Sequence, residues 1–120
     1  MANFESSKFN KIIREIIKKS LFTEKQIQII LNLKKIYASS YTISRGAYYR
    51  QVSQSRNKLA RLYYSIILLK GLGVLNPKDD DVISRLSEQI RVIRDSDIFP
   101  EKEEQIMDVI EKLIRQEVRM

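Results

Sequence analysis

Cysteine and histidine are both absent from this chain of 120 residues. Without cysteine the protein has no disulfide, no thiol nucleophile and no thiolate metal site. Without histidine it lacks the most common general base, proton shuttle and zinc ligand of proteins. No glycine-rich phosphate loop, paired-carboxylate motif or nucleophile motif takes their place. We therefore expect a protein that is not an enzyme and that uses no cofactor and no metal.

The chain is also poor in residues that make turns, with three Gly and two Pro, which leaves little room for an all-β fold. Apolar residues make up 43% and charged residues 31%, enough for a core and a solvated surface in a single domain over residues 1–120. The longest apolar run, Ile66 to Leu69, is far shorter than the roughly 20 residues of a membrane span. The first residues lack the apolar stretch of a signal peptide. These absences predict a cytoplasmic protein with no membrane partner.

Acidic residues are missing from one long segment of the chain. Residues 25–78 contain ten Lys/Arg and no Asp or Glu, whereas residues 79–120 contain seven Lys/Arg and twelve Asp/Glu. The net charge of +7 thus combines a strongly basic middle with an acidic end. A surface kept free of carboxylates fits a phosphate backbone, so we expect a nucleic-acid partner. An acidic protein partner, or a chance fluctuation in a basic protein, is the alternative.

Apolar residues recur at helical spacing along most of the chain, which predicts an all-α domain of about five to six helices. Thr23 and Gln26 form a capping box at the start of one helix, and Ser44 or Thr42 is the expected N-cap of another. Between Gly46 and Lys70 the pattern fits one long helix or two helices joined by a tight turn. The expected helices span about residues 5–21, 23–38, 46–70, 80–94 and 100–119.

Residues 45–64 fit the twenty-residue template of a helix-turn-helix motif, in which a small residue, here Ser53, occupies the turn. The second helix then exposes residue types that bond base edges in a major groove: Arg pairs with guanine, Asn with adenine, and Ser with either bases or phosphate. Ser53 would also cap this helix and aim its N-terminus at a phosphate. The candidate DNA-binding residues are therefore Arg45, Arg50, Ser53, Ser55, Arg56, Asn57, Lys58 and Arg61.

The same template assigns an inward face to each of its two helices, and this face is expected to consist of Tyr48, Tyr49, Val52, Leu59, Leu62 and Tyr63. All six tyrosines of the chain lie in the acid-free segment, where they either pack in the core or stack on single-stranded bases. Arg45 and Arg50 flank the first motif helix as phosphate clamps, or else are solvated surface charges.

Residues 22–75 resemble helix-turn-helix regulators of the winged-helix kind, in particular MarR-like proteins and small archaeal winged-helix proteins. The resemblance lies in the order of the helices and in the positions of the residues that begin and end them. Three segments carry the resemblance: the start of a capped helix at Phe22 to Ile27, a short helix at 44–51, and the glycine-containing end of the recognition helix at Leu68 to Leu75. Ser53 stands where a Gly is often found, and no apolar alternation follows Leu75, so the wing is absent or vestigial. The resemblance implies that the recognition helix reads DNA and that helices outside it form a homodimer.

The acidic helical part, over about residues 79–119, is the expected dimerisation unit, with the first helix as a further candidate. Asp79, Asp80 and Asp81 lack the glycine and the spacing of a calcium loop, so we expect them to cap a helix. The carboxylates near Pro100 fit the first turn of the last helix in the same way.

Taken together, the residues and the resemblance predict a dimeric helix-turn-helix regulator of transcription that binds double-stranded DNA. One alternative is a protein that binds nucleic acid without sequence preference, either chromatin-like or directed at RNA. Another is a helical interaction module that acts on a transcription complex through its acidic helices. The recognised DNA sequence and any small-molecule effector are left open by the sequence.

Overall fold

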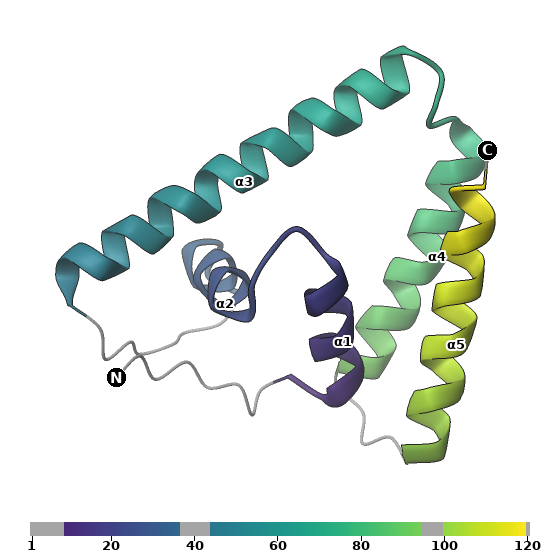
Figure 1. The fold of residues 1–120 in the computed structure, drawn as a ribbon, viewed down its shortest axis with the longest axis horizontal. Coiled ribbons are helices and arrows are strands. Elements are labelled where there is room, and N and C mark those ends of the chain that lie inside the picture. The colour runs from purple at the N-terminus through teal and green to yellow at the C-terminus, as the bar shows by residue number, and fades with distance from the viewer. Residues whose placement is uncertain (1–8, 37–43, 95–99, 120) are drawn as a thin grey trace.

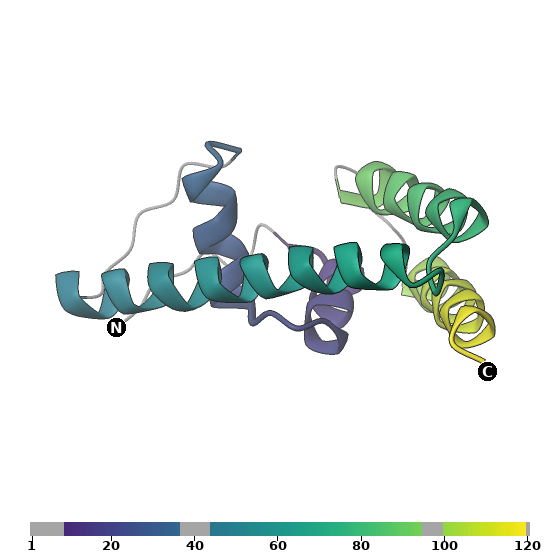
Figure 2. The same cartoon turned by 90° about the horizontal axis from the view of Figure 1, so that it is seen from above.

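The computed structural model describes residues 9–36, 44–94 and 100–119 (Figure 1). These residues form five helices and no strand, which confirms the predicted all-α class. Helix α3 runs along one side of the molecule, with α2 beneath its first half, α1 beneath its second half and the α4–α5 pair extending from its end (Figures 1 and 2). The helices are α1 (Lys11–Lys19), α2 (Glu24–Leu33), α3 (Arg45–Gly71), α4 (Pro77–Arg94) and α5 (Pro100–Glu117).

Helices α1 and α2 begin at side-chain caps. Asn10 accepts a hydrogen bond from the Ile13 amide at 2.9 Å, so α1 begins at Lys11, later than the sequence suggested. The side-chain amide of Asn10 also donates to the Ile93 carbonyl at 3.0 Å and so ties α1 to the end of α4. The predicted capping box at Thr23 is confirmed, because Thr23 and Gln26 each accept a hydrogen bond from the other's amide at 3.1 Å.

Helix α2 ends at Leu33, earlier than residue 38, and Lys35 follows with a left-handed φ of 59°. Such a residue cannot continue a right-handed helix, so the chain leaves the helix axis here. Most of the stretch between the expected helices over residues 23–38 and 46–70 lies outside the described residues, and so does the alternative cap Thr42. Ser44 is an N-cap of α3, accepting a hydrogen bond from the Ala47 amide at 3.1 Å.

Helix α3 is a single helix of 27 residues, which answers the question that the sequence left open between one helix and two. The turn expected at Ser53 is wrong, since Ser53 lies inside the helix. No Pro or Gly interrupts the chain between Gly46 and Gly71, and nothing therefore offsets the cost of breaking backbone hydrogen bonds there. The helix ends where Gly73 adopts a φ of +82°, a conformation that glycine takes without steric cost.

Helix α4 begins at Pro77, three residues earlier than expected, and Asn76 caps it. The Asn76 side chain accepts hydrogen bonds from the amides of Lys78 and Asp79, at 2.9 and 3.3 Å. Asp79 returns the contact by accepting one from the Asn76 amide at 2.7 Å. The sequence predicts that this run of aspartates caps the helix, but the cap is Asn76, and Asp79 completes the capping contact from the first turn of α4.

The core is small and centres on α1, which lies between α2 and the α4–α5 pair, and on the contact of α2 with α3 (Figure 1). Helix α2 packs chiefly against α3, while α1 packs against α2 and α5. Lys19 adds an ion pair to Glu111 at 3.3 Å across the α1–α5 contact. Within the described ranges, no helix has both the length and the apolar character that crossing a membrane requires. The buried apolar side chains are Phe9, Ile12, Ile17, Ile29, Val52, Ile93 and Ile110.

Candidate nucleic-acid interface

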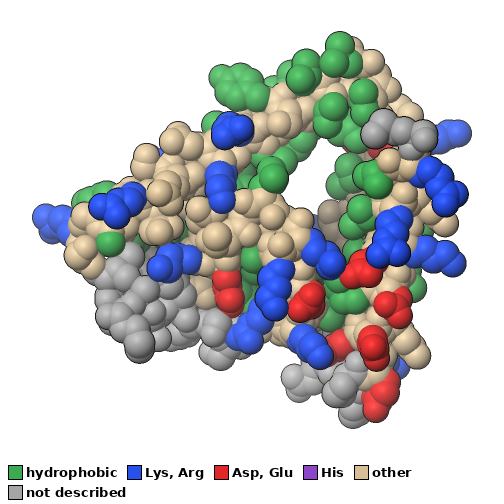
Figure 3. All heavy atoms as spheres, viewed as in Figure 1, with side chains coloured by type: hydrophobic (Ala, Val, Ile, Leu, Met, Phe, Trp, Pro, Cys, Tyr) green, Lys and Arg blue, Asp and Glu red, His purple; other side chains and the backbone are tan. Residues whose placement is uncertain are grey.

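One face of the N-terminal half of α3 is polar, basic and exposed. Because successive turns of a helix place residues three or four apart on one side, a stripe runs along α3 with Gly46 at its start. Four predicted DNA-binding residues share this stripe, which we call the basic face: Arg50, Ser53, Asn57 and Arg61, all of them exposed. Figure 3 shows Lys and Arg over this half of α3 and no acidic side chain beside them.

The opposite face of this half-helix packs on α2 and thereby fixes which side of α3 meets solvent. Val52 is buried there, and Tyr48, Leu59 and Leu62 are half-buried, as the sequence predicts for the inward face. Tyr49 and Tyr63 were expected to pack with them, but both side chains are about 60% exposed. A continuous helix has one inward side, whereas the helix-turn-helix template assumed two helices with different orientations.

Ser55 does not belong to the basic face, although the sequence placed it among the exposed residues. Its side chain is fully buried, and its hydroxyl donates to the Gln51 carbonyl one turn earlier at 2.7 Å. A small residue that satisfies its own hydroxyl in this way lets α2 approach α3 closely. The prediction that Ser55 is exposed is wrong for the same reason as the turn at Ser53.

Lys58 likewise turns toward the protein and not toward solvent. Its ammonium group donates to the Leu21 carbonyl and to the Gln26 side-chain oxygen, both at 2.9 Å. Since Gln26 also forms the capping box with Thr23, Lys58 links α3 to the start of α2. The expected exposure of Lys58 is therefore wrong, and its described contacts are structural.

Arg45 and Arg56 are exposed at one edge of the basic face. Arg56 lines a cleft of about 320 Å³ between the end of α2 and α3, and Lys34 lines the same cleft from α2. Lys34 and its exposed neighbour Lys35 therefore extend the positive surface beyond α3. The prediction of DNA-binding residues from the sequence did not include either lysine. Both belong to the acid-free segment, and this could have identified them.

The charges of the basic face have no acidic partner within the described part of the chain. Arg50, Arg56 and Arg61 form no ion pair there, while Lys70, near the end of α3, pairs with Asp80 at 3.0 Å. Acidic side chains elsewhere form ion pairs with other cations, such as Glu24 with Arg14 at 3.5 Å. Unpaired guanidinium groups on one exposed helix face produce a positive potential that attracts anions.

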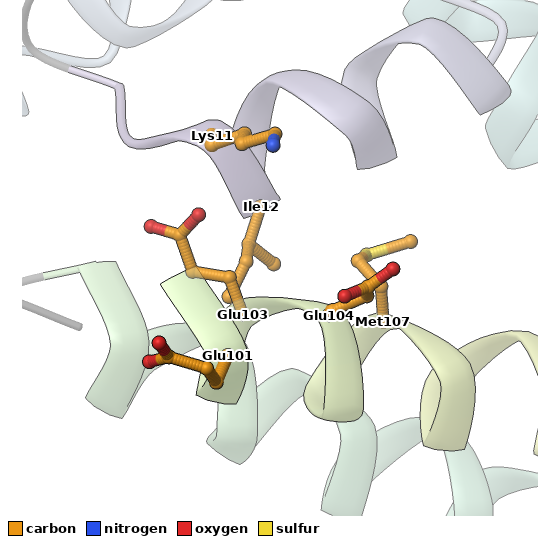
Figure 4. A pocket seen from close by; sticks show the side chains of 6 residues that line it. All are labelled: Lys11, Ile12, Glu101, Glu103, Glu104 and Met107. Carbon is orange, nitrogen blue, oxygen red and sulfur yellow. The ribbon is translucent and has the colours of Figure 1, made fainter. Parts of the chain in front are cut away.

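A second polar site lies between α1 and α5, in a cleft of about 340 Å³ (Figure 4). Ile12 points from α1 toward α5, where Met107 and three glutamates project from the other wall. Glu101 and Glu103 stand in the first turn of α5, where the helix dipole favours negative charge, as the sequence predicts. No cluster of three or more metal-ligating side chains occurs among the residues described, so we assign this cleft no chemistry.

Comparison with models of known protein families, with curated proteins and with solved structures finds no significant match for this chain. The expected kinship with winged-helix regulators therefore has no support from relatives.

Proposed function

We propose that this protein binds double-stranded DNA through the basic face of α3. The observation that carries the proposal is the exposed row of Arg50, Asn57 and Arg61, which has no partner among the described residues, on a helix whose opposite side is anchored on α2. An α-helix with its side chains is about 10–12 Å wide, and the major groove of B-DNA is about 12 Å wide. A rigid helix with one free basic side is therefore suited to this groove.

The proposed roles follow from the chemistry of each side chain. Arg50 and Arg61 can pair with guanine edges or with phosphates, and Asn57 can bond adenine in a bidentate manner. Lys34 and Lys35 at the end of α2 would contact the phosphate backbone beside the groove, because lysine binds phosphate as a point charge. In this arrangement α2 and α3 act as a pair of packed helices without the turn at Ser53.

The acidic helix α5 supports this orientation. It carries six Asp/Glu and three Lys/Arg, whereas α3 carries six Lys/Arg and no acidic residue. DNA would repel α5 and attract α3, so the protein would approach the duplex with α3 leading. Regulation of transcription is the role we propose for such a binding protein.

The test is a titration of the full chain against random-sequence duplex DNA at two salt concentrations. We expect tight binding at low salt that weakens steeply as salt rises, because phosphate contacts release counterions. Arg61→Ala should lower the slope of log K against log salt by about 1, and Arg115→Ala on α5 should leave it unchanged. Absence of binding at low salt, or equal losses in both variants, would refute the proposal.

A second candidate function is the binding of single-stranded nucleic acid, and the exposure of Tyr49 and Tyr63 is the observation that favours it. Bases can stack on exposed aromatic rings next to cationic side chains, with about 1–3 kcal/mol per base. Competition distinguishes the two functions. Single-stranded DNA that displaces duplex from the protein, with loss of this preference in Tyr49→Ala, would favour the second.

A further inference from the structure

The exposed side of α3 changes character near Tyr64. Up to Arg61 the side is basic and polar, but beyond it the same side continues with large apolar residues. Tyr64 is 75% exposed, Ile67 66% and Leu68 58%, and Leu72 follows in the turn after the helix. We call these four residues the apolar ridge. A helix that is apolar over most of its circumference is normally buried, so the ridge needs a partner.

A second unpartnered apolar surface lies between α4 and α5. The two helices leave a groove of about 440 Å³, whose apolar lining comes from Leu86 on α4 and from four residues of α5. Val109 is more than half-exposed at this groove, and Leu113 is also exposed. The remaining lining residues are Arg85, Gln89, Gln105, Ile106 and Ile110.

Within one chain the ridge does not reach the groove. Helix α4 turns away from the end of α3 after a short connection, and the α4–α5 pair lies at an angle to α3 (Figure 1). The described contact at this corner is the ion pair of Lys70 with Asp80, which joins the helix ends and leaves both apolar surfaces open. Figure 3 shows apolar side chains along the second half of α3 with open space beside them.

We propose that a second copy of this chain covers both surfaces, with the apolar ridge of each copy seated in the α4–α5 groove of the other. The two surfaces match in kind, since an apolar helix lies in an apolar groove between two helices. They are also compatible in charge, because the ridge has no charged residue and Arg85 is the only charged one among the described residues that line the groove, so the contact places no like charges opposite each other. A reciprocal exchange around a two-fold axis forms the contact twice and closes the assembly at two copies.

The first experiment measures mass in solution, and it does not depend on DNA binding. By sedimentation equilibrium at micromolar concentration, the full chain is expected at twice the 14.2 kDa of one copy. Leu68→Glu should raise the dimer dissociation constant by about tenfold or more, since it places a charge in the apolar contact. Leu21→Glu is the matched control, because Leu21 is equally exposed and lies outside both surfaces.

Circular dichroism establishes that both variants keep the wild-type helix content, as expected for exposed positions. A monomeric mass for the wild-type chain would overturn the proposal, and the ridge would then be left to a different protein. A dimer that Leu68→Glu leaves intact would overturn it equally.

The second experiment maps the contact by cross-linking, which is clean because the chain has no cysteine. Leu68→Cys and Val109→Cys are prepared separately and then mixed under mild oxidation. The proposal requires a disulfide between the two variants in the mixture, and it is overturned if Leu68→Cys links efficiently to itself while the mixed product is absent.

Discussion

At the residue scale, Ser53 and Ser55 have the same chemistry and opposite environments two positions apart. Ser53 faces solvent on the basic face, whereas Ser55 is fully buried against α2. Composition and spacing do not separate the two, since both serines fit a cap, a turn or a groove-facing position. The difference arises because α3 continues through Ser53 and turns Ser55 inward.

This pair makes a sharp test of the packing. Ser55→Leu should lower the free energy of unfolding by about 1–3 kcal/mol, because it forces extra volume into a closed contact. Ser53→Leu should change it by less than about 0.5 kcal/mol, as expected of an exposed helix position. Urea denaturation followed by circular dichroism measures both, and equal effects would show that Ser55 is not enclosed by α2.

Two carboxyl groups at the open end of the α4–α5 pair titrate together. Hydrogen bonds from the Asn76 amide and from the Glu117 side chain lower the pKa of Asp79 below its ordinary value of 3.8. The shared hydrogen bond, desolvation and the charge of Asp79 raise the pKa of Glu117 above its ordinary value of 4.5. At a pH between the two pKa values, the contact joins an ionised Asp79 to a protonated Glu117.

The direction of each shift sets the pH dependence of this contact. The stability that Glu117 contributes is complete below about pH 4.5 and is lost as the pH rises through its raised pKa. The stability that Asp79 contributes is lost only as the pH falls through its lowered pKa. Glu117→Gln keeps a donor at neutral pH, so the variant should be more stable than wild type at pH 7, with the difference shrinking toward pH 4. Thermal unfolding at both pH values measures this, with Glu104→Gln as the charge-matched control. A gain at pH 7 that persists at pH 4 would contradict the shared proton.

At the scale of elements, the continuity of α3 is the feature on which the site depends. One uninterrupted helix carries a basic face in its first half and the apolar ridge in its second, so both surfaces keep a fixed relation to each other. With a turn at Ser53, the two halves would point in different directions and the stripe from Arg50 to Arg61 would not exist.

Proline substitution tests this continuity. Ser53→Pro should cost about 3 kcal/mol or more of unfolding free energy, because proline inside a helix removes a hydrogen bond and clashes with the preceding turn. Arg45→Pro should cost little, because Arg45 is the first residue of α3, where proline is tolerated. The midpoint of chemical denaturation and the helix content of both variants are the measurements. A tolerated proline at Ser53 would indicate that the helix is broken there.

At the scale of the whole molecule, a small core contrasts with extensive exposed apolar surfaces. Among the described residues, seven buried apolar side chains form the core, while the apolar ridge and the α4–α5 groove stay uncovered in a single chain. Because the ridge directly follows the basic face along α3, a two-fold dimer built on the ridge would present two basic faces related by symmetry. Dimerisation and DNA binding, both proposed above, would then reinforce each other.

This coupling predicts that the salt dependence of DNA binding falls by half when the dimer dissociates into monomers. Leu68→Glu keeps every side chain of the basic face, so each monomer should still bind duplex DNA at low salt. Its slope of log K against log salt should be about half that of the wild-type dimer, because half as many phosphates are contacted. Fluorescence anisotropy with a labelled duplex measures both slopes. An unchanged slope would mean that one subunit makes all the contacts, and loss of binding in wild type would refute the DNA proposal while leaving the dimer untouched.

The sequence by itself determined the local features of this protein. The all-helical class, the capping box at Thr23, the end of α3 near Gly71 and the acid-free stretch could all be read from neighbouring residues. The cap of α3 could be narrowed to Ser44 or Thr42. These features depend on hydrogen bonds and backbone preferences within a few positions, which is the range over which a sequence pattern carries information.

Only the tertiary structure decided which side of α3 is free. Tyr49 points outward, Ser55 inward, and Lys58 reaches across to Leu21, because α2 packs against one particular side of an unbroken helix. Which side of α3 faces α2 depends on contacts between residues some thirty positions apart. The spacing of apolar residues along α3 does not reveal it. The same long-range packing left the ridge and the groove uncovered, since one chain places them at a corner where they cannot meet.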